Sequence, residues 1–417
     1  METADTGALT RKDFRGAVIS CYMSYVVQAI VNNLPPLLFV RFHEELGVSL
    51  GLITALSALN FTVQILVDFA SVWFIDRIGY RAAMVISHLS SFTGLAMLSF
   101  LPDVMPSPFA GLLISMVFYS IGGGLLEIGI SPLMDSIPSD SREASMSLLH
   151  SFYCWGHAAV ILLSTLFFRL AGIRNWRFLT LLWSAVPLVY CFVFATVKLP
   201  ESRFVREAEE QGEKVEAHLK NIGKLMRQGG FWLLFFMMIF AGSSEQAVSQ
   251  WVSTFAELGL HISKTSGDLV GALLFAVSMA CSRMLYGRIG KKIPIRPVML
   301  GGALLMALCY AGVAFIPVPL VKLILCGLCG FFVGVLWPGA CSIGGIRFGR
   351  YGTLIFSLMA LSGDIGCTSG PALVGAVSEA AGGDLTAGLS AAVIFPLAMA
   401  VCIVIMIVSD KKHKRAM

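Results

Sequence analysis

The sequence predicts an all-α membrane protein with twelve transmembrane helices, arranged as two six-helix halves related by a parallel pseudo-two-fold repeat. Three observations support this prediction. Of the 417 residues, 57% are hydrophobic and 13% are charged, whereas a soluble domain carries about 25% charged residues. Apolar stretches of about 20 residues, the length that crosses a bilayer, recur along the chain. One long polar segment divides these stretches into two sets of six.

The candidate spans are apolar segments separated by short polar turns. They cover residues 15–40, 51–75, 82–101, 109–133, 145–169, 177–197, 231–256, 267–287, 296–316, 319–345, 352–376 and 387–409. Because their number is even, both termini are expected on one side of the membrane. We therefore divide the chain into an N-terminal half (1–199), a linker that interleaves acids and bases (200–230) and a C-terminal half (231–417).

The distribution of basic residues predicts the orientation. Cytoplasmic loops of membrane proteins carry an excess of Lys and Arg. If the termini are cytoplasmic, most of the 30 basic residues lie in cytoplasmic segments. We therefore expect a multi-pass protein of the cytoplasmic cell membrane with both termini in the cytoplasm. The basic residues are spread over separate loops rather than gathered in one patch, which argues against a nucleic-acid partner.

Two short motifs recur in the second half of the chain. Asp76-Arg-Ile-Gly-Tyr-Arg81 follows the second span, and Gly287-Arg-Ile-Gly-Lys-Lys292 follows the eighth. Ser147-Leu-Leu in the fifth span recurs as Ser357-Leu-Met in the eleventh. The two copies of each motif are about 210 residues apart, and they belong to spans that cross the membrane in the same direction. This indicates a parallel repeat.

Charged side chains inside the spans are the strongest candidates for function. A charge at the bilayer centre costs about 2.5–3.5 kcal/mol on insertion scales, so such residues mark functional sites by default. We expect Glu127 to bind and release a proton, and we weigh the same role for Glu245 against a structural hydrogen bond. Arg283 needs an anionic partner. We assign it to a buried ion pair with Asp364, while Glu127, Glu245 and an anionic substrate stay open as partners.

Amide and aromatic side chains could bind a hydroxyl-rich ligand, because amides both donate and accept hydrogen bonds. The candidates for substrate binding are Gln28, Asn32, Asn33, His150, Gln246, Gln250, Trp251 and Trp337. For the tryptophans, packing or interfacial anchoring is the more frequent role. A further polar stripe, Asn60, Gln64 and Asp68, follows one face of the second span and could lie where the halves meet. The ten cysteines fall in apolar segments, and we predict no metal site and no cofactor.

The loop after the second span resembles a motif of the major facilitator superfamily. Asp76, Arg77, Gly79 and Arg81 match the DRxGxR pattern of that superfamily. There the acid and the bases form a conformational latch that holds the outward-open state. A plain positively charged loop is the alternative. In the second copy of the motif, Gly287 stands where the acid would be.

A closer resemblance is to the fucose:proton symporter branch of this superfamily and its sugar-transporting relatives. The segments 31–34 (VNNL), 122–132 (GGGLLEIGISP) and 147–156 (SLLHSFYCWG), together with Trp337-Pro338, are similar to its motifs. The resemblance implies a cavity lined by the first, fourth, seventh and tenth helices. The branch carries an aspartate where this chain has Pro36, so the resemblance fixes neither the coupling ion nor the substrate.

The sequence therefore predicts a secondary active transporter, not an enzyme, that moves a small polar solute by alternating access. A sugar or related compound is the expected solute and protons are the expected coupling ion, in a monomer within the lipid bilayer. The alternatives within transport are an exporter of an amphipathic compound and an organic-anion transporter that uses Arg283. A membrane enzyme has little support, because no HExxH motif and no Ser/His/Asp set is present. A transport-inactive sensor with the same fold stays open.

Overall fold

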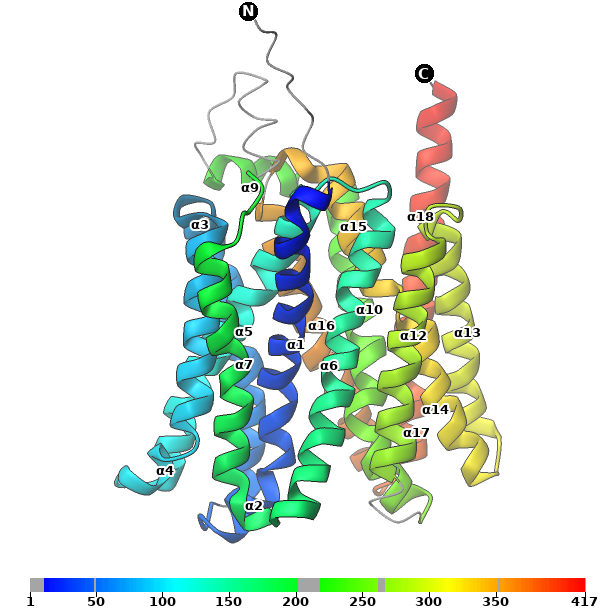
Figure 1. Ribbon diagram of the computed structural model, residues 1–417. Coiled ribbons are helices and arrows are strands. Elements are labelled where there is room, and N and C mark those ends of the chain that lie inside the picture. Colours follow the sequence, from blue (N-terminus) through cyan, green and yellow to red (C-terminus); the bar gives the residue numbers. More distant parts are fainter. Residues whose placement is uncertain (1–10, 49, 202–217, 262–266, 352, 417) are drawn as a thin grey trace, which may run out of the picture.

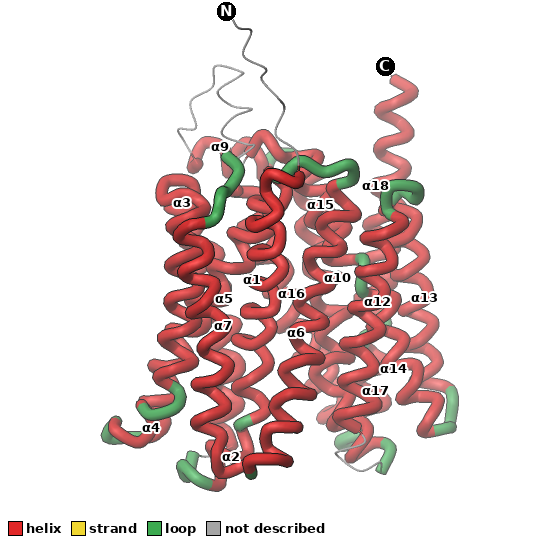
Figure 2. Tube along the Cα trace, in the orientation of Figure 1, coloured by secondary structure: helices red, strands yellow, loops and turns green. Residues whose placement is uncertain are grey.

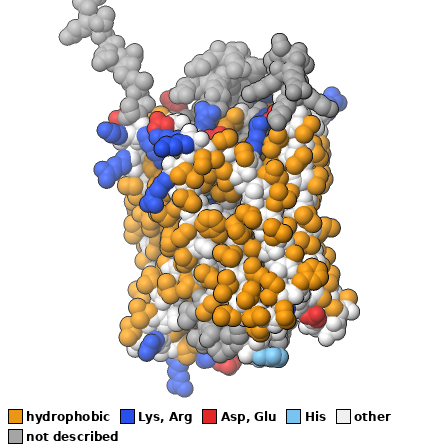
Figure 3. Space-filling model, turned by 90° about the vertical axis from the view of Figure 1, so that its right-hand side faces the viewer, with side chains coloured by type: hydrophobic (Ala, Val, Ile, Leu, Met, Phe, Trp, Pro, Cys, Tyr) orange, Lys and Arg blue, Asp and Glu red, His pale blue; other side chains and the backbone are white. Residues whose placement is uncertain are grey.

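The computed structural model describes residues 11–48, 50–201, 218–261, 267–351 and 353–416, which form helices and no strand. The helices run side by side, and both chain ends lie at one end of the bundle (Figures 1 and 2). We call this the terminal end. In one side view, hydrophobic side chains cover the middle of the molecule and charged side chains gather toward its two ends (Figure 3). This is the surface expected of a protein that spans a membrane.

The N-terminal half contains the first six predicted spans. Its long helices are α1 (Arg15–Leu37), α3 (Leu50–Met97), α5 (Pro108–Ser136), α6 (Arg142–Ala171) and α7 (Trp176–Thr196), and the short helices α2 (Phe39–Glu44) and α4 (Leu101–Val104) lie between them. The second and third spans form the single element α3, which is interrupted at Gly79, where φ is 74° and ψ is 162°. Glycine adopts positive φ without steric cost, so it suits this break.

The C-terminal half contains the other six spans. Its helices are α10 (Gly229–Thr254), α12 (Leu273–Ile289), α13 (Ile295–Phe315), α14 (Pro319–Val333), α15 (Leu336–Phe348), α16 (Thr353–Ala380), α17 (Leu385–Ala391) and α18 (Ile394–Ala416). The predicted span 319–345 is broken between α14 and α15, and the predicted span 387–409 is divided between α17 and α18. π-Helical turns, Phe255–Gly259 and Gly267–Ala272, precede α12.

Nine of the helical stretches that the structure describes are long and apolar enough to cross a membrane by themselves. The three predicted spans that are not among these nine lie in the helices α3 and α16, namely 51–75, 82–101 and 352–376. The predicted linker (200–230) lies largely in residues 202–217, outside the described part of the chain. The residues that follow form the short helix α9 (His218–Met226), and the proposed division of the chain at residues 199 and 231 stays a prediction.

The two halves contact each other toward the terminal end. Along the pair α6 and α12, the Ser147 hydroxyl donates a hydrogen bond of 2.8 Å to the Arg283 carbonyl. Along the pair α3 and α16, the hydroxyl oxygens of Ser71 and Ser357 lie 3.0 Å apart. In the loops, Lys291 forms an ion pair with Asp140 of the other half. The bundle is therefore closed at the terminal end.

Candidate functional site

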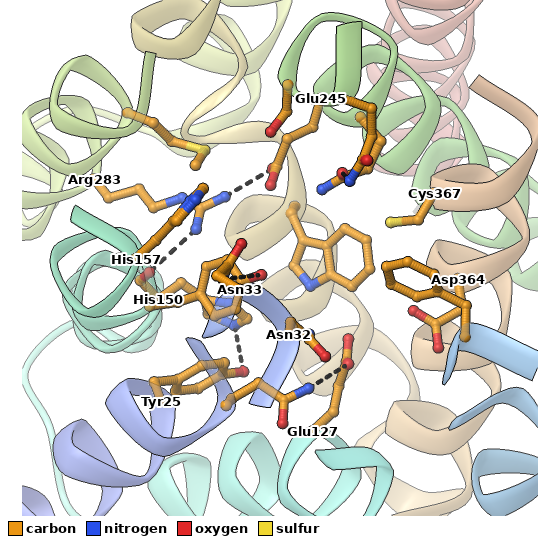
Figure 4. A pocket seen from close by; sticks show the side chains of 18 residues that line it. Tyr25, Asn32, Asn33, Glu127, His150, His157, Glu245, Arg283, Asp364 and Cys367 are labelled. Carbon is orange, nitrogen blue, oxygen red and sulfur yellow. Dashed lines mark hydrogen bonds and ion pairs between the residues drawn. The ribbon is translucent and has the colours of Figure 1, made fainter. Parts of the chain in front are cut away.

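A polar cavity lies between the two halves, and the space there that no atom fills, open solvent included, is about 790 Å³. Eleven of the predicted site residues line it: Gln28, Asn32, Asn33, Glu127, His150, Glu245, Gln246, Gln250, Arg283, Trp337 and Asp364. They come from α1, α5 and α6 of one half and from α10, α12, α15 and α16 of the other (Figure 4). The polar side chains of the separate spans therefore meet in one place.

Arg283 joins the two halves at the edge of this cavity. Its Nη2 lies 3.0 Å from Glu245 Oε2, and its Nε donates to the Gly334 carbonyl at 2.8 Å, between α14 and α15. Its Nη1 donates across the halves to the His150 carbonyl at 3.1 Å. Arg283 therefore pairs with Glu245, which had been left open as a partner, and the predicted ion pair with Asp364 is wrong. A buried guanidinium needs an acid and several acceptors, and Arg283 has both.

His150 projects into the cavity beside α1. Its Nε2 lies 3.3 Å from the Tyr25 hydroxyl, and the two ring centroids are 4.7 Å apart. The same hydroxyl lies 3.1 Å from the hydroxyl of Ser131. This arrangement places a ring nitrogen and two hydroxyls next to one another, and each can both donate and accept depending on how its protons are arranged.

Glu127 has an amide and not a cation as its hydrogen-bond partner. Gln28 Nε2 donates to its Oε2 at 3.4 Å and lies 3.3 Å from Gln64 Oε1. Gln64 in turn donates to Asn32 Oδ1 at 3.0 Å. An amide chain therefore runs from the polar stripe of α3 through α1 to this carboxyl. Unlike Glu245, Glu127 can therefore change its protonation without breaking an ion pair.

The other wall of the cavity carries amides and an indole ring. Gln250 Nε2 donates to Gln246 Oε1 at 3.1 Å, one turn apart on α10. The ring of Trp337 lies against Gly363 of α16, where an added Cβ would come within 2.0 Å of a ring carbon. Glycine at this position thus permits the ring to lie beside the cavity.

Two predicted groups lie elsewhere. Trp251 is not among the residues that line the cavity, and its Nε1 donates to the Pro371 carbonyl at 3.1 Å. In the DRxGxR loop, the side chains of Asp76 and Arg77 lie outside the described part of the structure. Arg81 donates three hydrogen bonds of 2.8–2.9 Å to the carbonyls at the end of α7, in its own half. The latch assigned to these residues stays a prediction.

Several lining residues were not among the predicted site residues, notably Tyr25, Tyr153 and His157. Helical spacing could have indicated them. Tyr25 precedes Gln28 by three residues, and residues three or four apart share a helix face. Tyr153 and His157 follow His150 by three and seven residues in the same way. Because an aromatic ring in a membrane helix is usually a packing residue, this spacing alone was a weak signal.

The cavity continues away from the terminal end. A second cavity shares Asn32, Phe61 and Gln250 with the first and is further lined by apolar residues such as Phe42 and Leu112. Phe42 belongs to α2, which lies at the opposite end of the bundle (Figure 1). Among the described residues, no group of three or more His, Cys, Asp or Glu side chains is placed to hold a metal ion.

The protein has two membrane-spanning helical halves that line a polar cavity between them and are closed at one end. This arrangement is typical of membrane transporters. A family model described as Major Facilitator Superfamily matches residues 17–371. The chain belongs to this family, as predicted. The family and the fold are those of a transporter that moves a small molecule through the membrane, and not those of an enzyme.

Solved structures of two transporters have a similar fold. The outward conformation of FucP has a TM-score of 0.78 at 15% identity, covering 94% of this chain and 98% of that chain. A variant of the E. coli fucose:proton symporter FucP gives 0.73 at 16% identity, with 93% and 97% covered. The proton:xylose symporter XylE gives 0.73 at 14% identity, with 95% and 96% covered. These identities show the fold alone. A comparison with curated proteins finds no sequence that matches this chain.

Proposed function

We propose that this protein is a secondary active transporter of a small hydroxyl-rich solute, a sugar or a related compound, coupled to protons through Glu127. The observation that carries the proposal is the cavity itself. It holds the carboxyl of Glu127, whose hydrogen-bond partner is an amide and not a cation, beside amides from both halves, under the contacts that close the terminal end. Movement of the halves about such a site would expose it first on one side and then on the other.

The lining of the cavity supports a neutral polar solute. Asn32, Asn33, Gln246 and Gln250 offer amide donors and acceptors from both halves. Trp337 offers an apolar ring surface, which suits the C–H face of a sugar. The similar structures are those of a fucose:proton symporter and a proton:xylose symporter, and this supports the same class of solute here.

The two acids have different parts in the proposal. Glu127 takes up a proton from the water of the cavity. Glu245 is paired with Arg283, so it acts through that pair, which in turn contacts the backbone of the other half. A proton on Glu127 drives transport only if the two states of the transporter bind it with different affinity.

We propose a location in the cytoplasmic membrane with both termini in the cytoplasm. The basic residues of the loops support this orientation, and both chain ends lie at one end of the bundle (Figure 1). In that orientation the described state is closed toward the cytoplasm. The similarity to a structure named as an outward conformation agrees with it. A monomer is the expected assembly.

The organic-anion alternative relies on Arg283. Every nitrogen of this guanidinium already donates to a protein acceptor, namely the Gly334 carbonyl, the His150 carbonyl, Cys154 Sγ or Glu245. These bonds use four of its five N–H donors and Glu245 compensates its charge, so an anion could reach only the second N–H of Nη2 unless Glu245 moved. The arrangement therefore favours the neutral solute over the anion.

Thermal unfolding of the purified protein with a panel of sugars, polyols, organic acids and amphipathic compounds tests the proposed solute class. A ligand present at a hundred times its dissociation constant stabilises the folded state by about 2.7 kcal/mol. We expect stabilisation by members of the sugar and polyol set. Stabilisation by organic acids alone, or by amphipathic compounds alone, would support the corresponding alternative and contradict the proposal.

A further inference from the structure

Two acids lie at the contact between the halves, outside the roles described so far. Asp68 belongs to α3 and Asp364 to α16, and they are 1% and 3% exposed. Within the described structure, neither carboxylate oxygen of Asp68 has a hydrogen-bond partner, and Oδ2 of Asp364 has none. Buried polar atoms are nearly always hydrogen-bonded. Three unpaired acceptor atoms on two neighbouring acids therefore require an explanation.

The two acids lie next to the contact that closes the terminal end. Ser71 and Ser357, whose hydroxyl oxygens are 3.0 Å apart, mark where α3 and α16 touch. Asp68 is three residues from Ser71, and Asp364 is seven residues from Ser357. At a rise of about 1.5 Å per residue, Asp364 lies farther along the interface than Asp68. Asp364 also lines the central cavity, so the pair extends from the cavity toward the closed contact.

The electrostatic surroundings of Asp68 are acidic only. Of the elements packed against α3, α16 brings Asp364 and α5 brings Glu127 within electrostatic reach, whereas α1, α2 and α7 bring no charged group of the described residues there. Asp364 is in turn acted on by Glu127. Arg283, the buried cation of the cavity, is paired with Glu245. Figure 4 shows Asp364 and Glu127 away from Arg283.

Ionised acids without a cation repel one another strongly in a medium of low dielectric constant. A protonated carboxyl removes the repulsion and gains an O–H group that can donate a hydrogen bond. The closed contact between α3 and α16 is thus compatible with a proton on the pair. It is poorly compatible with two negative charges, one on each half.

We propose that Asp68 and Asp364 form a proton-binding site between the halves, and that the bound proton keeps the terminal end closed. The proton comes from water in the cavity, adds to a carboxylate of Asp364 or Asp68 to form an O–H bond, and leaves to water when that end opens. Loss of the proton leaves one charge on each side of the contact, and their repulsion separates α3 from α16. This inference rests on one part of the proposed function, namely that the two halves separate at the terminal end during transport.

The direction of the pH effect follows from this arrangement. If the closed state binds one proton more than the open state, the ratio of closed to open protein changes by up to about tenfold per pH unit. The closed state is favoured at low pH and is lost as the pH rises. Asn has the shape of a protonated Asp and cannot ionise, so amide variants should stay closed at every pH.

Disulfide formation between two introduced cysteines, Ser71→Cys and Ser357→Cys, measures the closed contact in the purified full-length protein, because these side chains already meet. We expect the crosslinking yield under a fixed oxidant to fall from mildly acidic to mildly alkaline pH. When Asp68→Asn and Asp364→Asn are added, the crosslinking yield should be high at both the acidic and the alkaline pH. The same thiols react in both proteins, so this comparison removes the pH dependence of the thiol chemistry.

Either single amide variant should also flatten the profile, which keeps the test valid if the double variant does not fold. Equal pH profiles in the parent and in the amide variants would overturn the proposal. A Glu127→Gln background separates the two hypotheses, since it should keep the pH dependence of crosslinking. Loss of that dependence in Glu127→Gln would refute the Asp68–Asp364 site and leave the coupling role of Glu127 intact. If Glu127→Gln keeps the pH dependence of crosslinking but no solute of the panel stabilises the protein, the Asp68–Asp364 site is supported and the proposed function is contradicted.

Discussion

Arg283 Nη2 and Glu245 Oε2 form a buried ion pair with a separation of 3.0 Å, and the same guanidinium donates to the His150 carbonyl of the opposite half. The pair lies beside the cavity and close to the contact that closes the terminal end. A change in the cavity that moves Glu245 would therefore also move a contact between the halves. This gives a physical route by which an occupied site could alter the closed end.

The first prediction concerns this ion pair. Removal of one partner of a buried pair costs about 3–5 kcal/mol, because the other charge is left uncompensated. We expect Glu245→Gln to lower the free energy of unfolding by an amount of this order. The double variant Glu245→Gln with Arg283→Gln should lose less than the sum of the two single variants. Thermal or denaturant unfolding of the purified proteins measures both.

A matched control is the exposed pair of Arg41 and Glu44, whose charged atoms are 2.6 Å apart and whose side chains are 23% and 52% exposed. Exposed pairs contribute about 0–1 kcal/mol, so Glu44→Gln should change stability little. If Glu245→Gln is no more costly than Glu44→Gln, the role given to the buried pair is wrong.

The second prediction concerns Glu127. Because its hydrogen-bond partner is the amide of Gln28, a neutral amide in its place keeps the contact and removes the proton. We expect Glu127→Gln to abolish accumulation of solute against a gradient in vesicles and to leave exchange of solute partly intact. The exposed Glu379 provides the control, since Glu379→Gln should accumulate solute like the parent. Full accumulation by Glu127→Gln would contradict its assignment as the coupling acid.

The third prediction concerns the contact between Gly363 and Trp337. A Cβ at position 363 would lie 2.0 Å from a ring carbon of Trp337, so the ring must move. We expect Gly363→Ala to weaken the binding of a stabilising solute by about two- to tenfold, since displacement of one aromatic contact removes roughly 0.5–1.5 kcal/mol. Gly301→Ala on α13 is the control, because nothing lies within 4 Å of that Cβ. Solute titrations monitored by thermal shift compare the two, and equal affinities would exclude a contribution from the ring position.

The fourth prediction concerns the exposed pair of Asp140 and Lys291, which joins the loops of the two halves. The hydrogen bond from Lys291 lowers the pKa of the Asp140 carboxyl below its ordinary value of 3.8. The contribution of this pair to the closed state is therefore present above the ordinary value and is lost as the pH falls through the lowered pKa. Between mildly acidic and mildly alkaline pH the pair stays ionised, and it should respond to salt instead.

Asp140→Asn should accordingly reduce crosslinking between Ser71→Cys and Ser357→Cys at low ionic strength, and the difference from the parent should shrink at high salt. It should leave the pH profile near neutrality unchanged. If crosslinking no longer depends on pH in Asp140→Asn, the pH response belongs to the loops and not to the buried acids.

Much of the candidate site was predictable because the bilayer makes buried polar groups costly. Glu127, Asn32 and Gln246 stand out in apolar segments of the sequence, and the structure places all three at one cavity. The twelve spans and the repeat were likewise predictable, since they depend on hydropathy and spacing within short segments. The break between α14 and α15 was missed although Gly334 lies in it and Pro338 follows four residues later, where the absent N–H leaves the Gly334 carbonyl without its helical partner. Hydropathy does not change there, so the whole run was predicted as one span.

The sequence by itself determined the class of this protein, since twelve apolar spans and the DRxGxR loop are local features of the chain. Only the tertiary structure decided which charges meet. It paired Arg283 with Glu245 rather than with Asp364, directed Trp251 away from the cavity, and brought Asp68 within electrostatic reach of Asp364. Such pairings depend on how helices far apart in the chain are rotated and placed side by side. That geometry is fixed by the packing of both halves together and by no single segment.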